Sequence, residues 1–382
     1  MARVLGLGAK RALAWIRLAD RGTRDRERVH VRHADREPRA AHAKRPPTRA
    51  TRREPNIRIP PSGRRPSAKS VAWQHQRALE SSTSRFTFGS TMTNLSFGEK
   101  ITQSAWRLAP KRMLSRIIGW SARRRLPGAI QNALLRSYAK AYRLNSSEAE
   151  HPIERYPSLQ AFFTRRLAPG ARALPPDADS VVAPSDGTIC EAGFATAGKL
   201  LQAKGSDFTL QALLADDVLA ARLVGGPYLV IYLSPRDYHR VHFPAGGKVI
   251  AWSHIPGKLF PVGSRSVKRE PGLFARNERF VTVVDSPRGR YAVVMVAAVG
   301  VGHITASFDP EVATHSGGFA GDSVRHKAFD PPIEIERGQE LGIFNLGSTT
   351  ITIFEPGGGE LNELVSNAQI EMGTPVGRII PS

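Results

Sequence analysis

The sequence predicts an α+β protein: a β-rich domain preceded by basic amphipathic helices and a disordered N-terminal extension. Three observations support this fold class. Short β-branched runs separated by Gly and Pro follow residue 180, apolar residues recur at helical spacing between 109 and 143, and the first 91 residues lack sustained apolar periodicity. The expected divisions are therefore residues 1–91, 92–150 and 151–382.

The extension, residues 1–91, contains 22 Lys or Arg and 7 Asp or Glu, and it is dominated by Arg, Ala, Pro and Ser. Such a composition cannot bury enough apolar surface to offset the entropy of folding. Three interpretations stay open: a disordered arm, a targeting peptide with a short basic helix, or non-coding sequence upstream of a true start at Met92. Five acidic residues among the first 37 count against a transit peptide, because transit peptides are poor in acids.

Two basic amphipathic helices are expected next. The first spans 109–122, with apolar Met113, Leu114, Ile117 and Ile118, and Trp106 and Trp120 flank its apolar face. The second runs from Pro127-Gly128 to about Arg143, with Ile130, Leu134 and Tyr138 on one stripe. Basic amphipathic helices suit an anionic membrane surface, although both helices could instead pack on the body with solvated cations. A shorter helix is expected from Ser158 to Arg166.

Charge separates this front end from the body of the chain. Residues 1–91 carry +15, residues 92–150 carry +8 and residues 151–382 carry −1, which gives the formal total of +22. A nucleic-acid-binding core should carry its cations on the folded domain itself, so no nucleic-acid partner is expected. No run of 18 apolar residues occurs, and the longest, from Tyr291 to Gly302, is interpreted as a buried strand.

Strands are predicted beyond Ser180 from β-branched runs bounded by turn residues: Leu229 to Leu233, Phe280 to Asp285, Tyr291 to Val299, Leu341 to Leu346 and Thr349 to Phe354. One helix is expected between Gly193 and Gly226, with Leu210, Leu213, Leu214 and Val218 at apolar spacing.

The step Gly347-Ser348 lies between two of these predicted strands. The plain interpretation is a hairpin turn, since glycine adopts positive φ freely. The alternative is chemical: the Ser348 hydroxyl attacks the Gly347 carbonyl, and the resulting ester is split by β-elimination. That reaction converts the serine into a pyruvoyl group.

Two further stretches favour the chemical interpretation. Val182 to Ile189 reads Val-Ala-Pro-Ser-Asp-Gly-Thr-Ile, and Tyr232 to Pro244 contains Ser-Pro-Arg-Asp-Tyr-His-Arg-Val-His-Phe-Pro. Together with Leu-Gly-Ser-Thr at 346–349 they resemble the phosphatidylserine decarboxylase proenzymes of bacteria and mitochondria. The resemblance extends from about Phe97 to Ile380.

The resemblance implies roles for individual residues. Asp186, His242 and Ser348 would form the triad for self-cleavage between Gly347 and Ser348, and His239 would serve decarboxylation. A serine hydroxyl needs a neighbouring base, and a histidine with a pKa near neutrality suits that task. Taken alone, Asp186 before Gly187 reads as a turn residue, and His242 as a structural one.

The same resemblance implies a cofactor, a substrate and a location. The covalent pyruvoyl group from Ser348 would form a Schiff base with phosphatidylserine and release CO₂, which leaves phosphatidylethanolamine. The cleaved fragments would remain together as a heterodimer. The expected place is a membrane surface, either the inner face of a bacterial cytoplasmic membrane or the mitochondrial inner membrane.

Two other site assignments stay open. His239 and His242 form a His-x-x-His pair that could hold zinc, but the flanking prolines favour extended structure and no third ligand stands at a familiar spacing, so no metal is expected. Arg236, Arg276 and Arg279 are candidates for the phosphate or carboxylate of the headgroup, or else for structural salt bridges.

Overall fold

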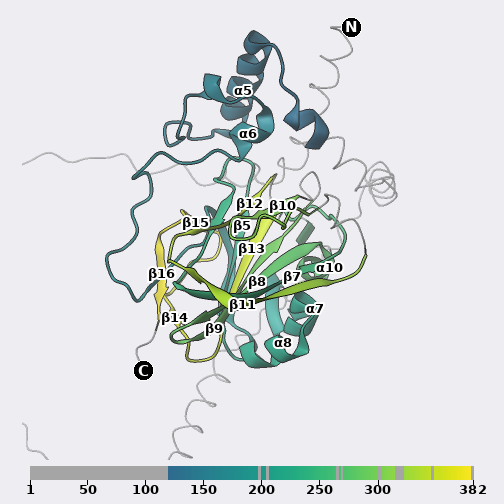
Figure 1. Cartoon of the computed structure of the whole chain (residues 1–382), viewed down its shortest axis with the longest axis vertical. Coiled ribbons are helices and arrows are strands. Elements are labelled where there is room, and N and C mark those ends of the chain that lie inside the picture. The colour runs from purple at the N-terminus through teal and green to yellow at the C-terminus, as the bar shows by residue number, and fades with distance from the viewer. Residues whose placement is uncertain are drawn as a thin grey trace, which may run out of the picture. The chain divides into compact units, whose positions relative to one another are not determined.

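The structure is a computed structural model that describes residues 119–379, apart from 197–198, 204–205, 264–265, 268–269, 299–302, 315–321 and 346–347. The expected disordered extension and most of the first predicted helix lie outside these residues. The described part is β-rich, as predicted, with short helices before and between the strands (Figure 1).

Residues 119–166 form a small helical unit, here called the helical cap. It contains α5 (Gly128–Tyr142), η2 (Ile153–Arg155) and α6 (Leu159–Phe163). The helix α5 ends at Arg143, which adopts a left-handed φ of 53°. Ser158 caps α6 because its hydroxyl accepts a hydrogen bond from the Ala161 amide at 3.1 Å. The helices predicted at 127–143 and 158–166 are therefore confirmed to within a few residues.

The buried face of α5 differs from the predicted stripe. Leu135, Tyr138, Ala139 and Tyr142 are buried at helical spacing, whereas Ile130 is 58% exposed. The predicted stripe of Ile130, Leu134 and Tyr138 is therefore only partly correct. The first buried residue of α5 is Gln131, one position after Ile130, and Ile130 itself is exposed to solvent.

The body is built on an eight-stranded sheet in the order β11-β7-β8-β9-β13-β5-β2-β15. Its strands are β2 (Gly187–Phe194), β5 (Pro227–Leu233), β7 (Gly247–Ile255), β8 (Arg279–Ser286), β9 (Gly289–Val296), β11 (Arg325–Ile335), β13 (Ser348–Phe354) and β15 (Gln369–Ile370). Alternation along each strand divides its apolar residues between two faces. One face packs against α7 (Leu210–Leu214), α8 (Asp217–Leu223) and α10 (Leu273–Arg276).

The single helix expected around 210–218 is wrong, because the chain forms two helices there. Ala215 adopts a left-handed φ of 51° and ends α7, and the Asp216 carboxylate then caps α8 through the Leu219 amide at 2.9 Å. Val218 consequently points to solvent.

The other face of the large sheet packs against two smaller sheets. One has the order β10-β12-β6, with β10 (Ile304–Ala306), β12 (Glu340–Phe344) and β6 (Arg240–His242). The second has the order β1-β16-β14, with β1 (Ser180–Val182), β16 (Pro375–Arg378) and β14 (Glu360–Leu361). A separate hairpin joins β3 (Lys199–Ala203) and β4 (Ser206–Thr209).

Three adjacent strands of the large sheet continue into three adjacent strands of a small one. Strands β9, β13 and β5 lie side by side, and the chain passes from them to β10, β12 and β6, which also lie side by side. The described residues of these three connections, 234–239, 297–298 with 303, and 345, together with Ser348 at the start of β13, are here called the corner. The plain interpretation of Gly347-Ser348 as a hairpin turn is not supported, because β12 and β13 belong to different sheets.

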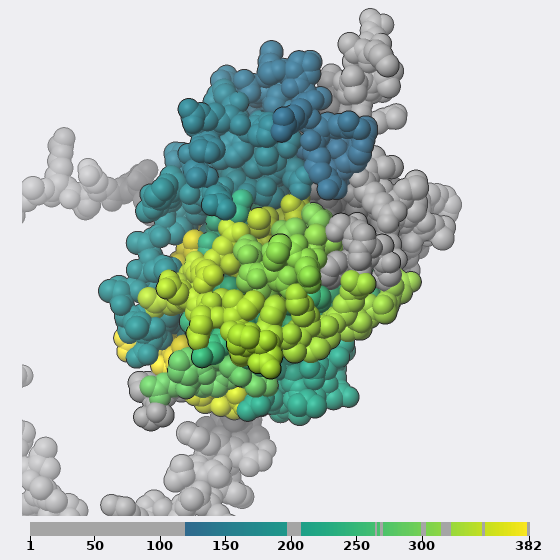
Figure 2. Space-filling view, in the orientation of Figure 1, coloured from purple at the N-terminus to yellow at the C-terminus, as the bar shows by residue number. Residues whose placement is uncertain are grey.

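The helical cap packs on this corner. The hydroxyl of Tyr138 donates to the Pro235 carbonyl at 2.8 Å, and the Gln160 amide donates to Asn345 Oδ1 at 2.7 Å. Arg240 of β6 donates to the Thr164 carbonyl at 3.0 Å. Figure 2 shows the blue surface of the cap lying against the green and yellow surface of the body. The cap thus covers the place where the predicted serine, Ser348, begins its strand.

Candidate active site at the corner

Ser348 is the first residue of β13 and is fully buried. It pairs with Leu233, a member of the core between the two sheets, so the Ser348 side chain faces the same interior. Its hydroxyl has no hydrogen-bond partner among the described residues. Thr349 and Thr352 on the same strand share that state, but only Ser348 lies at the corner. Gly347, the other half of the predicted cleavage site, lies outside the described residues.

His239 lies at the corner too, at the end of the connection that begins after Leu233. Its Nδ1 donates to the Asp237 carbonyl at 2.8 Å, so Nε2 carries the lone pair, and Nε2 has no partner among the described residues. The ring lies against Phe163 of the cap, with centroids 3.9 Å apart and planes tilted by 40°. Burial, opposed by the bond to Asp237, lowers the pKa of His239 to about 3. This imidazole is therefore neutral at physiological pH.

His242 ends β6 with both ring nitrogens engaged. Its Nδ1 donates to the Gly338 carbonyl at 2.8 Å, and its Nε2 lies 3.1 Å from the Tyr238 hydroxyl. Because a carbonyl can only accept, Nδ1 carries the proton and Tyr238 donates to Nε2. Burial is the main cause that lowers the pKa of His242. The ring is thus in the neutral form that a general base requires.

Asp186 precedes β2 and is buried. Its Oδ1 accepts from the Met372 amide at 2.7 Å and its Oδ2 from Arg172 at 3.1 Å. Gly187 must be glycine because a Cβ there would lie 2.3 Å from the Tyr232 carbonyl oxygen. This close approach of β2 to β5 fixes where Asp186 lies.

A cavity of about 430 Å³ lies beside His242. Its lining includes Tyr238, His242, Arg172, Met372 and Glu340, together with residues 166–168 at the end of the cap. Its size is suited to a small polar headgroup. Glu340 in this lining accepts from Arg240 at 2.7 Å and from Ser307 at 2.5 Å.

The structure brings the predicted residues to one region without joining them into a chain of hydrogen bonds. Asp186 is near enough for its charge to raise the pKa of His242 slightly, but its printed partners are Arg172 and Met372. Within the described ranges, no hydrogen bond links Ser348 to His242. The roles of Asp186, His239, His242 and Ser348 stay predictions.

The zinc alternative can be compared with the same geometry. Across the described part of the chain, no group of three His, Cys, Asp or Glu residues is arranged to hold a metal ion. His239 and His242 each donate one ring nitrogen to a backbone carbonyl.

The three arginines considered for the headgroup are occupied elsewhere. Arg279 is 3% exposed and donates to the carbonyls of Ala212, Leu213 and Asn277; burial lowers its pKa to about 10. Arg276 pairs with Glu270 at 3.1 Å, and Arg236 donates to Gln369 at 2.7 Å. Arg279 therefore braces the core.

Tyr238 was not singled out in the sequence, although it lies within the stretch 232–244 that also carries both histidines. A tyrosine four residues before a histidine in an extended segment gives no signal of contact. A turn precedes this segment, where the Ser234 amide donates to the Asp237 carboxylate at 2.6 Å.

Comparisons with known proteins find one family model and several relatives that match this chain. Residues 159–378 match the family model described as phosphatidylserine decarboxylase. A phosphatidylserine decarboxylase proenzyme of Anaeromyxobacter sp. (strain K) is 44% identical over 280 residues, which cover 73% of this chain and 98% of the relative. Proteins of the same name from Myxococcus xanthus and Bordetella avium are 42% and 41% identical, over 65% and 69% of this chain and 88% and 89% of their own lengths.

Proposed function

The chain belongs to the phosphatidylserine decarboxylase family, and from that premise we propose that it is a self-cleaving proenzyme that converts phosphatidylserine to phosphatidylethanolamine and CO₂. The observation that carries this proposal is the buried Ser348 hydroxyl, which has no hydrogen-bond partner among the described residues. Ser348 pairs with Leu233, the residue directly before the connection that carries His239. Burying a hydroxyl without a hydrogen bond is costly, so such a group is a candidate for chemistry.

The proposed self-cleavage begins at Ser348. Its oxygen attacks the Gly347 carbonyl carbon, the peptide C–N bond breaks, and an ester forms. Loss of the Ser348 Cα proton then expels the Gly347 carboxylate, and water releases the nitrogen as ammonia, which leaves a pyruvoyl group at residue 348. His242 is the proposed base, because its buried ring is neutral and its Nε2 carries the lone pair, which accepts from Tyr238 in this structure.

The corner fits the pyruvoyl group that this reaction would leave. The group is no larger than the serine it replaces, and His239 offers a ring nitrogen without a described partner in the same corner. Once formed, its carbonyl supplies an electron sink for the bond between Cα and the carboxylate of a bound amino-acid headgroup. Nε2 of His239 is the proposed atom that holds the proton returned to the carbon losing CO₂.

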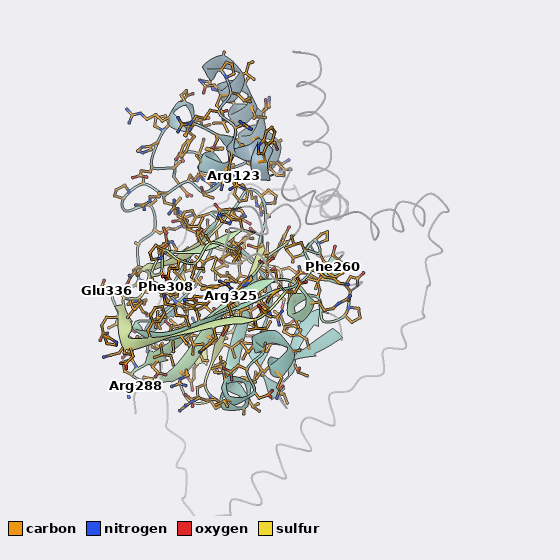
Figure 3. The ribbon with its side chains drawn as sticks, turned by 45° about the vertical axis from the view of Figure 1, so that its right-hand side comes forward. Arg123, Phe260, Arg288, Phe308, Arg325 and Glu336 are labelled. Carbon is orange, nitrogen blue, oxygen red and sulfur yellow. The ribbon has the colours of Figure 1, made fainter. Side chains whose placement is uncertain are left out.

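A membrane surface is the proposed location, on the inner face of a bacterial cytoplasmic membrane or on the mitochondrial inner membrane. The helical cap exposes Trp120 and Ile130, each 58% exposed, and Arg123, Arg124 and Arg125 lie between them in the sequence. Arg123 lies in the cap in Figure 3. Apolar side chains beside cations suit an anionic lipid interface. No described helix is long and apolar enough to cross a bilayer.

Intact mass tests the central step. The expressed chain should give a C-terminal fragment, residues 348–382, whose first residue has the mass of a pyruvoyl group. Ser348→Ala should remain one chain, with Thr349→Ala as a control that cleaves. A wild-type protein that decarboxylates phosphatidylserine while intact would refute the proposal.

A further inference from the structure

Arg165 is a buried arginine whose side chain has unused donors. It follows α6 in the helical cap and is 4% exposed. Its Nη2 donates to the Arg236 carbonyl at 3.3 Å, whereas Nε and Nη1 have no hydrogen-bond partner among the described residues. Guanidinium groups stay charged in proteins, so a buried one is expected to be paired.

Arg279 provides the contrast within the same protein. It is equally buried, at 3% exposure, but all three of its nitrogen atoms donate to backbone carbonyls at 2.5 to 2.9 Å. Arg172, beside the cavity, pairs with Glu148 and Asp186 at 3.0 and 3.1 Å. Arg165 has no such ion pair within the described ranges. Its guanidinium lies 5.9 Å from the centre of the Phe162 ring, and its Nε and Nη1 are buried without a hydrogen-bond partner.

The position of Arg165 relates it to the corner. Two residues before it, Phe163 lies against His239, and Arg165 itself contacts the backbone of Arg236 in the connection 234–239. That connection starts at Leu233, the cross-strand partner of Ser348. Residues 166–168, directly after Arg165, line the cavity with Tyr238 and His242. Arg165 does not itself line the cavity, but it lies in the chain between Phe163, which contacts His239, and Arg166, which lines the cavity.

We propose that Arg165 binds the phosphodiester of the phospholipid headgroup; this inference rests on the proposed function. The headgroup of phosphatidylserine carries two anions, a carboxylate and a phosphodiester. A cation held on the carboxylate would stabilise the ground state and oppose loss of CO₂, whereas the phosphodiester keeps its charge throughout the reaction. Arginine is suited to phosphate because its donors form charge-assisted hydrogen bonds.

The kinetic test uses full-length Arg165→Lys and Arg165→Gln, with exposed Arg155→Gln of the cap as the matched control. All three should self-cleave, since Arg165 acts on the substrate and not on Ser348. In detergent micelles, Arg165→Gln should raise the KM for phosphatidylserine at least about tenfold, the effect of losing a hydrogen bond to a charged group, with a smaller change in kcat. Arg165→Lys should fall between Arg165→Gln and the wild type, and Arg155→Gln should match the wild type.

A binding measurement separates this inference from the proposed function. Soluble glycerophosphoserine, titrated and followed by ³¹P NMR, should bind the wild type and Arg155→Gln and bind Arg165→Gln at least about tenfold more weakly. Inorganic phosphate should compete for the site. Reductive trapping of serine methyl ester, an amine without phosphate, should be equal in wild type and variants.

The outcomes divide as follows. Unchanged KM and unchanged glycerophosphoserine affinity in both Arg165 variants would overturn the inference and leave the decarboxylase proposal intact. Failure of both variants to cleave, while Arg155→Gln cleaves, would overturn it also, since Arg165 would then serve folding or processing. Arg165-dependent binding in a wild-type chain that neither cleaves nor decarboxylates would support the site and refute the proposed function.

Discussion

The hydroxyl of Tyr238 donates to Nε2 of His242 across 3.1 Å, while Nδ1 of the same ring is held by the Gly338 carbonyl. Nε2 is the nitrogen that must accept the Ser348 proton if His242 is the base for cleavage. In this structure, Tyr238 therefore occupies the lone pair that the reaction needs.

The first prediction concerns this hydrogen bond. Tyr238→Phe removes the donor and keeps the ring. Nε2 of His242 can then accept the Ser348 proton without first losing a hydrogen bond worth about 1 kcal/mol. Cleavage should become about fivefold faster, since that energy equals about a fivefold change in rate. A time course of cell-free translation followed by gel electrophoresis measures the rate. Slower cleavage in the variant would show that Tyr238 orients His242 productively.

The second prediction assigns the two histidines to separate reactions. His242→Ala should remain uncleaved, because Ser348 loses its base. His239→Ala should cleave and lose roughly 10² to 10⁴ in decarboxylation rate, the usual contribution of a general acid–base group. Mass spectrometry and CO₂ release from labelled substrate measure the two steps. If both variants cleave normally, His242 is not the base.

The third prediction is a pH dependence of stability. His239 has a pKa of about 3 when folded and about 6.5 when unfolded, so below pH 6.5 the unfolded chain binds a proton that the folded chain does not. Its contribution is fully present above pH 6.5 and is lost as the pH falls toward 3. Between pH 7.5 and pH 5, His239 should cost about 2 kcal/mol of unfolding free energy.

Denaturant unfolding of the wild type and of His239→Gln at both pH values checks this contribution. The variant lacks the titrating group, so its stability should fall less over the same interval. Parallel losses in the two proteins would assign the acid sensitivity to other groups.

The fourth prediction concerns lipid binding by the helical cap. The double variant Trp120→Ser, Ile130→Ser removes two exposed apolar side chains, and liposome affinity should fall at least about tenfold, since burying each contributes on the order of 1 kcal/mol or more. Val218→Ser in α8 is the control, because Val218 is 79% exposed but lies on the β body. Flotation with anionic liposomes at high salt isolates the apolar part of the affinity. Equal flotation of the double variant and the control would remove the cap from this role.

The strands could be predicted because their side chains carry the pattern locally. The runs at 229–233 and 349–354 are β-branched and bounded by turn residues, and both became central strands. The hairpin interpretation of Gly347-Ser348 failed because strand pairing depends on parts of the chain distant in sequence. Whether two consecutive strands pair with each other depends on which other strands are available. Here β9 and β5 occupy both edges of β13, so β12 cannot pair with it.

Motifs revealed the candidate site residues, but contacts could not be read from them. Sequence placed Asp186, His239, His242 and Ser348 in one constellation, yet the partners of Asp186 turned out to be Arg172 and Met372. Arg165 carried no signal, because its lack of partners depends on which carbonyls and carboxylates the folded chain places around it. Sequence equally could not show that Arg279 is held by three backbone carbonyls, so it was a candidate ligand for the headgroup.

The central position of β13 in the eight-stranded sheet bears on the fate of the cleaved product. After a cut before Ser348, the short fragment would supply β13, flanked on both edges by strands of the long fragment, and its β15 and β16 would pair with β2 and β1. The two pieces would be interlaced, so neither could leave without global unfolding. Their lifetime as a pair would equal the unfolding time of the whole domain, and dilution would not separate them.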